Sequence, residues 1–397
     1  MGVRLVLAAI KEPRYSDYNI PHDFPVQIPA LTLTQPRGRL NVAPNGYRID
    51  KEMKVSTIGP FFLPSNQFEH FYRGGDRIGA LRDGPGGPMR PEEWIGSTVT
   101  RFGMSEEGLS RLPGGGFLLD AISQDPLLWL GREHYEAFGE STEILVKLLD
   151  PDQRLPVHFH PNKAFAREHL SLQHGKTEAW IVLEAPPGAG VGLGFAQQMG
   201  SEQVLNLVKS HDSAALLNSL NFFEVHPGDA ILVPAGTPHA IDAGIFVLEL
   251  QEPTDLSILL EWDGFAVDGE TDGHLGLGFD TAIEALNLSP LSADERSALI
   301  VSTGLNSEEA MPLLTRSADG YFRADLMPGN GSSISAGFSV LLVIDGEGIL
   351  HTENSGSIAI ARGDALVVPF ASGRYTVTGA QAISCRPPKP AKAAMAH

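Results

Sequence analysis

The feature that most restricts the fold is a segment that occurs twice. Gly228-Asp-Ala-Ile-Leu-Val-Pro and Gly363-Asp-Ala-Leu-Val-Val-Pro share their length, their Gly-Asp opening and their closing proline, and an apolar strand-like run precedes each. A Gly-Asp pair between two apolar runs is typical of a turn between β-strands. Repetition of such a unit along one chain predicts two copies of one β-barrel.

Helical patterns interrupt the strands at a few places. Apolar residues recur at helical spacing from Pro126 to Phe138 and from Glu202 to Leu220, and the second stretch fits two short helices packed on a sheet. Residues 278–315 are also expected to be helical. Short strands are expected at Thr98 to Phe102 and at Glu143 to Leu149.

These patterns predict a domain organisation with two barrels. The expected parts are an irregular N-terminal extension (1–52), a first barrel domain (53–277) with a helical insertion around 202–220, a helical linker (278–315), a C-terminal barrel (316–386) and a disordered tail (387–397). The tail is expected to be disordered because it consists mainly of Pro, Lys and Ala.

Composition excludes several kinds of partner and indicates a compartment. The 397 residues carry a formal net charge of −19, which repels phosphate backbones and anionic membranes, so neither nucleic acid nor a membrane is expected as a partner. The one cysteine, Cys385, is expected to be a buried thiol in a reducing compartment. No cleavage site follows the apolar start, and no later run is long enough to span a bilayer, so a cytoplasmic location is expected.

Four residues in the first copy of the repeat have the chemistry of a metal site. His158 and His160 are one residue apart, so on a strand their side chains point to the same face. Glu178 and His239 lie in or beside other strand-like runs. Imidazole nitrogens with one carboxylate suit zinc, and nearly as well manganese, iron(II), nickel or cobalt. The second copy has Phe370-Ala-Ser-Gly-Arg where the first has His239, so one metal ion is expected, in the first barrel only.

Six motifs in a fixed order resemble those of the type I phosphomannose isomerases, a family of the cupin superfamily. They are Ile144-Leu-Val-Lys-Leu-Leu-Asp, His160-Pro-Asn-Lys, Gly175-Lys-Thr-Glu-Ala-Trp, Pro227-Gly-Asp, Pro234-Ala-Gly-Thr-Pro-His-Ala and Glu249-Leu-Gln. The resemblance covers about Met53 to Arg386 and is strongest between residues 144 and 262. It implies a mainly β fold with a helical insertion and two cupin-type β-barrels (jelly rolls), of which the first bears the metal and the second is degenerate.

The resemblance also implies a ligand set. In that family Gln, His, Glu and His hold a zinc ion. His160, Glu178 and His239 match three of these ligands, and His158 stands where the family usually has Gln. The expected cofactor is therefore one divalent ion, with zinc as the first choice.

The reaction that the resemblance implies is the interconversion of an aldose and a ketose. In the family this is mannose 6-phosphate to fructose 6-phosphate, and a proton moves between adjacent carbons through a cis-enediol. Lys176 matches an active-site lysine and Glu249 an active-site acid, so these two are the expected catalytic residues. Lys147, which matches a lysine of a neighbouring strand, Lys163 and Asp255 are the expected substrate-binding residues.

Two positions depart from the family pattern. Pro156 stands at the phosphate-binding serine, and Leu259 at the substrate-binding arginine. Loss of a guanidinium removes strong bidentate contacts with a phosphate. Either another cation such as Lys163, Arg73 or Arg77 replaces it, or the substrate is not a hexose 6-phosphate of the usual kind.

Three functions stay open at this point. They are a metal-dependent sugar isomerase, a cupin metalloenzyme of another reaction type such as an oxygenase or epimerase, and a non-catalytic sugar-binding protein. Lys176 and Glu249 favour the isomerase, because a dioxygenase needs open metal positions more than a proton shuttle. The expected partner is a small sugar or sugar phosphate, and the metal and the oligomeric state are left open.

Overall fold

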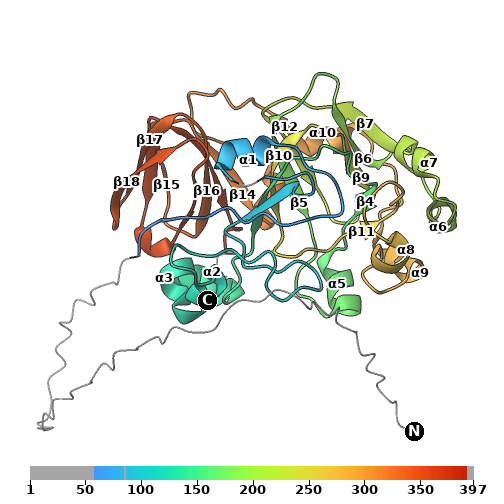
Figure 1. Ribbon diagram of the computed structural model, residues 1–397, viewed down its shortest axis with the longest axis horizontal. Helices are drawn as coiled ribbons and strands as arrows, with labels where there is room; N and C mark the ends of the chain where they lie inside the picture. The colour runs from blue at the N-terminus through green and yellow to red at the C-terminus, as the bar shows by residue number, and fades with distance from the viewer. Residues whose placement is uncertain (1–57, 85, 391–397) are drawn as a thin grey trace, which may run out of the picture. The chain divides into compact units, whose positions relative to one another are not determined.

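The protein is mainly β, as predicted, and within the described part of the chain its strands form four antiparallel sheets (Figure 1). The computed structural model describes residues 58–84 and 86–390, so the extension predicted at 1–52 lies outside the described residues. Sheet I has the order β12 (Ile300–Ser302), β8 (Asp229–Val233), β5 (Glu178–Glu184), β10 (Phe246–Gln251), β3 (Leu145–Leu149) and β2 (Glu92–Ile95). Sheet II has the order β11 (Ile258–Leu259), β4 (His158–Phe159), β9 (His239–Ile241), β6 (Gly190–Phe195) and β7 (Leu220–Glu224).

The other two sheets come mainly from the C-terminal part of the chain. Sheet III has the order β1 (Phe61–Phe62), β19 (Ala365–Val368), β16 (Ser339–Asp345), β21 (Gln381–Arg386), β14 (Arg323–Met327) and β13 (Met311–Pro312). Sheet IV has the order β15 (Asn330–Ile334), β20 (Tyr375–Thr378), β17 (Glu347–Thr352) and β18 (Gly356–Ala361).

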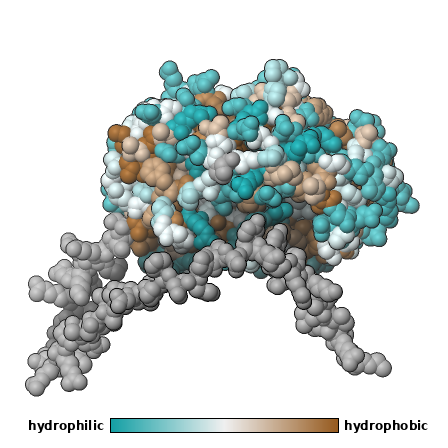
Figure 2. Space-filling model, viewed as in Figure 1, coloured by the Kyte–Doolittle hydropathy of each residue, from teal (hydrophilic) through white to brown (hydrophobic). Residues whose placement is uncertain are grey.

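Short helices connect and cover the sheets. The α-helices are α1 (Arg77–Arg82), α2 (Leu118–Gln124), α3 (Pro126–Leu130), α4 (Arg132–Phe138), α5 (Lys163–Leu170), α6 (Ser201–Lys209), α7 (Ser213–Asn218), α8 (Gly269–Asp272), α9 (Phe279–Ala282) and α10 (Ala293–Ala298). The 3-10 helices are η1 (Ile283–Ala285), η2 (Arg316–Gly320) and η3 (Phe370–Ser372). Hydrophobic residues lie in small groups among hydrophilic ones on the face that Figure 2 shows.

The sheets pack as layers in the order IV, III, I, II, which Figure 1 shows from β17 and β18 on the left to β4 and β9 on the right. Side chains alternate along a strand, so a buried strand serves two cores. On β5, Trp180 and Val182 belong to the core shared with sheet II, whereas Ala179 and Ile181 belong to the core shared with sheet III. A further core joins sheets III and IV. Sheet I is therefore covered on both faces.

The two Gly-Asp turns of the sequence repeat have the same geometry. Gly228 has φ of 92° and Gly363 has φ of 93°, values in the left-handed region that favours glycine. In each turn the aspartate, Asp229 or Asp364, accepts a hydrogen bond from the backbone N–H three residues earlier, at 2.7 Å in both. Each turn leads into a strand that pairs with the strand three places earlier in the chain, β8 with β5 and β19 with β16. The repeat is thus present in the structure as well as in the sequence.

Replacement of Gly363 by alanine is expected to lower the free energy of unfolding by about 2 kcal/mol or more, because a left-handed backbone alone costs about 1–2 kcal/mol with a side chain. The added Cβ would also lie 1.9 Å from the backbone oxygen of Leu81. The measurement is urea unfolding. Gly320→Ala is the control, because no atom lies within 4 Å of its added Cβ. Equal unfolding midpoints for the two variants would contradict the prediction.

The predicted helices at 126–138 and 202–220 are confirmed, each as a pair of short helices, α3 with α4 and α6 with α7. The prediction for 278–315 is wrong after Ala298, because β12 and β13 follow α10. Ile300 and Val301 are β-branched residues, which favour a strand over a helix. In addition, β12 pairs with the outer side of β8, and this pairing supplies backbone hydrogen bonds that an isolated segment lacks. The pairing partner lies about 70 residues away, so local periodicity did not reveal it.

The C-terminal end of the described chain is packed. Pro387 and Pro388 are buried, and Arg323 donates to the backbone oxygen of Pro387 at 2.8 Å, so the first residues of the predicted tail are in contact with sheet III. Residues 391–397 lie outside the described residues. Cys385 is buried as predicted, in the core between sheets I and III, and burial raises the pKa of its thiol. Over residues 58–84 and 86–390 the structure contains no helix with the length and apolar character to span a membrane.

Candidate metal centre

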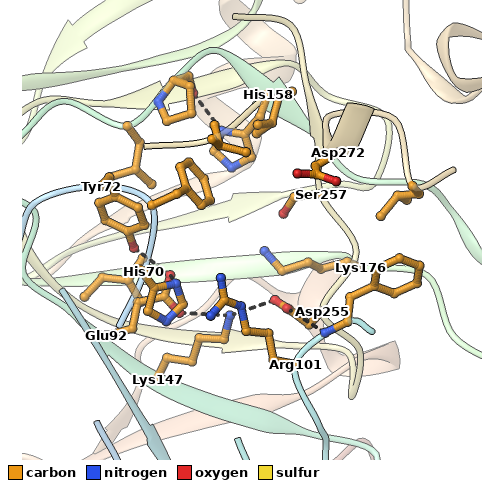
Figure 3. Close-up of a pocket in the computed structure, with 18 of the residues that line it drawn as sticks. His70, Tyr72, Glu92, Arg101, Lys147, His158, Lys176, Asp255, Ser257 and Asp272 are labelled. Atoms are coloured by element: carbon orange, nitrogen blue, oxygen red, sulfur yellow. Dashed lines mark hydrogen bonds and ion pairs between the residues drawn. The ribbon is translucent and has the colours of Figure 1, made fainter. Parts of the chain in front are cut away.

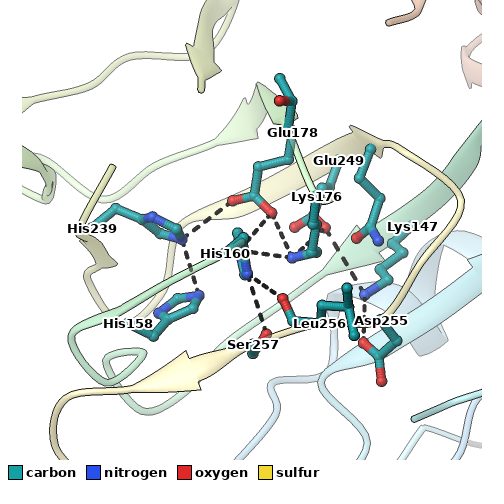
Figure 4. Close-up of polar contacts among 12 residues, drawn as sticks. Lys147, His158, His160, Lys176, Glu178, His239, Glu249, Asp255, Leu256 and Ser257 are labelled. Atoms are coloured by element: carbon teal, nitrogen blue, oxygen red, sulfur yellow. Dashed lines mark hydrogen bonds and ion pairs between the residues drawn. The ribbon is translucent and has the colours of Figure 1, made fainter. Parts of the chain in front are cut away.

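Three histidines converge between sheets I and II, and their side chains are buried (Figure 4). His158 lies on β4 and faces His239 on β9, because the two residues are paired in the sheet register. Their Nε2 atoms are 3.0 Å apart. His160 follows β4 directly, and the ligand atoms of all three histidines lie within 4.8 Å of one another. The predicted pairing of His158 and His160 on one face is therefore confirmed.

Backbone carbonyls fix the tautomer of each ring. In chain order, the Nδ1 atoms of the three histidines lie 2.8, 2.6 and 2.8 Å from the backbone oxygens of Pro156, Leu256 and Thr237. A carbonyl oxygen only accepts, so each Nδ1 carries the hydrogen and each Nε2 presents a lone pair. Metal-binding histidines are typically held in this way.

These lone pairs fit a cation. Two Nε2 lone pairs that face each other at 3.0 Å repel, unless a proton or a metal ion lies between or beside them. Burial opposes a proton: it lowers the pKa of His160 and of His239 to about 3, and it lowers the pKa of His158 as well. The cluster of His158, His160 and His239 could therefore hold a metal ion.

Glu178 on β5 adds a carboxylate to this cluster. Its Oε2 atom lies 3.0 Å from Nε2 of His160, and its Oε1 atom lies 3.3 Å from Nε2 of His239. Trp180 donates from Nε1 to Oε1 at 3.0 Å, which orients the carboxylate. Although burial opposes ionisation, the ammonium of Lys176 holds the pKa of Glu178 well below its usual range. The structure thus brings together all four residues that were predicted to bind a metal.

Lys176 and Glu249 lie beside the cluster. Nζ of Lys176 is 2.9 Å from Nε2 of His160, 2.5 Å from Oε2 of Glu178 and 3.7 Å from Oε1 of Glu249. Glu249 is on β10, and its Oε1 accepts no hydrogen bond from the described residues. Burial and, next, the charge of Glu178 raise the pKa of Glu249 to about 7. A buried carboxyl of this kind can exchange a proton near neutral pH.

Lys147 on β3 links Glu249 to a second set of acids. Its Nζ lies 3.4 Å from Oε2 of Glu92, 3.9 Å from Oε1 of Glu249 and 3.6 Å from Oδ1 of Asp255. It also lies 4.4 Å from the ring centre of Trp94. Despite burial, these carboxylates raise the pKa of Lys147, so it is charged.

A cavity of about 650 Å³ opens onto these groups (Figure 3). Seven of the predicted site residues line it: Lys147, His158, Lys176, Glu178, His239, Glu249 and Asp255. His160 lies in the wall behind it, in contact with Glu178 and Lys176. Pro156 and Leu259, the two departures from the family pattern, also line the cavity.

The other predicted cations lie elsewhere. Lys163, predicted to bind substrate, does not line the cavity, and its Nζ is 3.1 Å from Oε1 of Glu252. Arg73 and Arg77, the other suggested replacements for the missing arginine, do not line it either. None of the three therefore stands in for a guanidinium at Leu259.

Further polar residues that were not predicted as site residues also line the cavity: His70, Tyr72, Glu92, Arg101, Ser257, Asp268, Thr271 and Asp272. Arg101 was placed in a predicted strand, but the structure has a loop from Thr98 to Arg101, and Nη1 of Arg101 donates to Glu107 Oε1 at 2.8 Å. Glu92 could have been found from the sequence, because it lies in a run with the apolar residues Trp94 and Ile95. That run forms β2, and it places the acid of Glu92 on a buried face.

Comparisons with known proteins agree with this geometry, although no family model matches the chain. Mannose-6-phosphate isomerase ManA of Bacillus subtilis is 28% identical over 70% of this chain and 85% of its own length. The mannose-6-phosphate isomerase of Streptococcus mutans is 38% identical over 33% of this chain and 41% of its own length. The crystal structure of the mannose 6-phosphate isomerase from Bacillus subtilis superposes with a TM-score of 0.63 and 22% identity, over 83% of this chain and 100% of the other. With the ordered motifs and the buried histidine cluster, these matches make the chain a distant member of the mannose-6-phosphate isomerase family.

Proposed function

We propose that the protein is a metal-dependent isomerase that interconverts an aldose and a ketose of the mannose type. The observation that carries the proposal is the position of Lys176 and Glu249, which lie 3.7 Å apart beside three histidines and Glu178 at the base of a cavity. ManA of Bacillus subtilis bears the name of a mannose-6-phosphate isomerase, which supports this type of substrate. We further propose that sheets I and II form the metal-bearing cupin-type barrel and that sheets III and IV form the degenerate one.

The metal would be held by His158, His160, Glu178 and His239, and zinc is the first choice for three imidazoles and one carboxylate. When bound, a divalent ion supplies Lewis-acid polarisation of the sugar carbonyl and the adjacent hydroxyl.

The chain's own residues would move the proton. Glu249 is the proposed base, because its Oε1 atom is buried without a hydrogen-bond donor among the described residues and its pKa lies near neutrality. It would accept the proton from the carbon next to the carbonyl and return it to the former carbonyl carbon through a cis-enediol, while a hydroxyl proton passes from one of the two adjacent sugar oxygens to the other. Lys176 would donate hydrogen bonds to the sugar oxygens. Lys147 and Asp255, which are 3.6 Å apart, would orient the sugar hydroxyls.

The test uses the full chain loaded with zinc, in heavy water. Mannose and mannose 6-phosphate are supplied separately, and the ketose and the incorporation of deuterium at C1 or C2 are followed by NMR. Ketose formation with deuterium incorporation is the expected result for at least one sugar. Oxygen uptake without isomerisation would instead identify an oxygenase, and sugar binding without exchange would identify a non-catalytic protein.

Replacement of Trp180 by phenylalanine is expected to weaken zinc binding by about 10- to 100-fold, because partners that orient a metal ligand typically contribute this much. The change removes the hydrogen bond to Glu178 and keeps an aromatic ring in the core. Zinc affinity is measured by competition with a chromogenic chelator. Trp262→Phe is the control, since Trp262 stacks on Phe279 and, among the described residues, makes no hydrogen bond to the four proposed ligands. Equal affinities for the two variants would refute the role of Trp180.

A further inference from the structure

The part of the cavity wall that Leu259 and Pro156 form beside His158 has no group that binds phosphate. Leu259 is the strand partner of His158, and Pro156 accepts the Nδ1 hydrogen of the same histidine through its backbone oxygen. Both residues line the cavity. A leucine side chain and a proline offer neither a charge nor a hydrogen-bond donor to an anion.

Carboxylates lie next to this wall instead. The backbone N–H of Leu259 donates to the oxygen of Gly273 at 2.8 Å, so the end of α8 lies against β11. Asp268 and Asp272 line the cavity from the two ends of α8. Asp268 accepts hydrogen bonds at the start of the helix, from Glu270 N at 3.2 Å and Thr271 Oγ1 at 2.8 Å. Among the described residues no hydrogen bond or ion pair holds the carboxylate of Asp272, which Figure 3 shows on the same side of the cavity as His158 and Ser257.

The cations of the cavity are already paired with acids. Lys147 and Lys176 each lie within 4 Å of a carboxylate of the cavity, and Arg101 pairs with Glu107 at its edge. The carboxylates that line the cavity are Glu92, Glu178, Glu249, Asp255, Asp268 and Asp272. When Glu249 is ionised, these carboxylates exceed the combined positive charge of Lys147, Lys176, Arg101 and one divalent ion by one.

We infer that the sugar substrate carries no phosphate group, so that the enzyme isomerises a free aldose and its ketose. A phosphate dianion would add two negative charges to a cavity that already has an excess of carboxylates, and no unpaired guanidinium would receive it. Sugar hydroxyls, by contrast, donate hydrogen bonds to carboxylates. Asp272 and Ser257 would contact the end of the sugar that the phosphate occupies in a hexose 6-phosphate. The inference rests on the proposed isomerase function.

The test compares kcat/KM of the zinc-loaded full chain for mannose and for mannose 6-phosphate at low ionic strength. We expect free mannose to be preferred by about tenfold or more, a ratio that corresponds to about 1.4 kcal/mol. A preference for mannose 6-phosphate would overturn the inference and leave the isomerase function intact. Absence of isomerisation and of deuterium exchange with both sugars would instead overturn the proposed function.

A charge variant tests the cause of the preference. Asp272→Asn is expected to raise kcat/KM for mannose 6-phosphate severalfold relative to that for mannose. Glu270→Gln is the control, because it removes a charge from the same helix but Glu270 is exposed outside the cavity. In this variant kcat/KM for mannose 6-phosphate relative to that for mannose is expected to stay unchanged. Salt screens the repulsion between the phosphate and the carboxylates of the cavity. Added salt should therefore raise kcat/KM for mannose 6-phosphate relative to that for mannose in the unmodified protein, and should raise it less in Asp272→Asn. Equal ratios in both variants and at both salt concentrations would overturn the electrostatic basis of the inference.

Discussion

The His239→Ala variant is expected to lose the bound metal and to turn over sugar about a thousandfold more slowly or worse, because several kcal/mol of Lewis-acid stabilisation is lost and each 1.36 kcal/mol is tenfold. His239 is fully buried, and its Nε2 faces both His158 and Glu178 at 3.0 and 3.3 Å. Thr237, which lies behind the ring, meets it through its backbone oxygen rather than through its side chain.

The measurement is metal content after dialysis, together with kcat for ketose formation. His226→Ala is the matched control, because its side chain is 69% exposed and lies on the turn before β8. The control should keep about one metal ion per chain and full activity. Retention of stoichiometric zinc by His239→Ala would show that the histidine cluster is not the metal site.

The Glu249→Gln variant is expected to lower kcat by about 10²- to 10⁴-fold, the usual contribution of a general base. Glutamine has nearly the same shape, so zinc content and KM should change little. Glu202→Gln on α6 is the control, since it removes an exposed carboxylate, and no residue of α6 lines the cavity. A loss of zinc that parallels the loss of activity would assign Glu249 to the metal shell rather than to proton transfer.

The pH profile gives a second measure of Glu249. Because burial and the charge of Glu178 raise its pKa to about 7, the unprotonated base is lost as the pH falls through that value. The kcat/KM of the unmodified protein is therefore expected to decline below about pH 7 rather than in the ordinary carboxyl range near 4. Glu249→Gln should lack this decline in its residual activity. An acid limb near pH 4 in the unmodified protein would contradict the role as base.

The metal cluster could be predicted because strand geometry is local. His158 and His160 share a face by alternation, and Lys176 lies two residues before Glu178, so it points to the same side. The Gly-Asp turns were also predictable, because only a few residue types adopt their backbone conformation. In both cases the sequence carries the constraint within a few residues.

The rest of the cavity depends on contacts between distant segments. Arg101 reaches the cavity from a loop, and Asp272 from a helix of one turn, and neither segment has a periodic pattern. Leu259 and Pro156 were flagged by resemblance alone, and their acidic neighbours on α8 became visible only when the backbone hydrogen bond from Leu259 to Gly273 placed that helix against β11. Irregular segments of this kind are positioned by tertiary packing rather than by local preference.

The layer order places sheet III behind the sheet that forms one side of the cavity. One face of sheet I carries Lys147, Glu178 and Glu249, and its opposite face is joined to sheet III by a continuous hydrophobic core. A shortened protein that ended before residue 278 would lose most of sheet III from that reverse face, and the apolar surface exposed there would favour aggregation. A shorter version of this protein would therefore require a redesigned hydrophobic covering for sheet I, even though the removed residues include none of the proposed reacting groups.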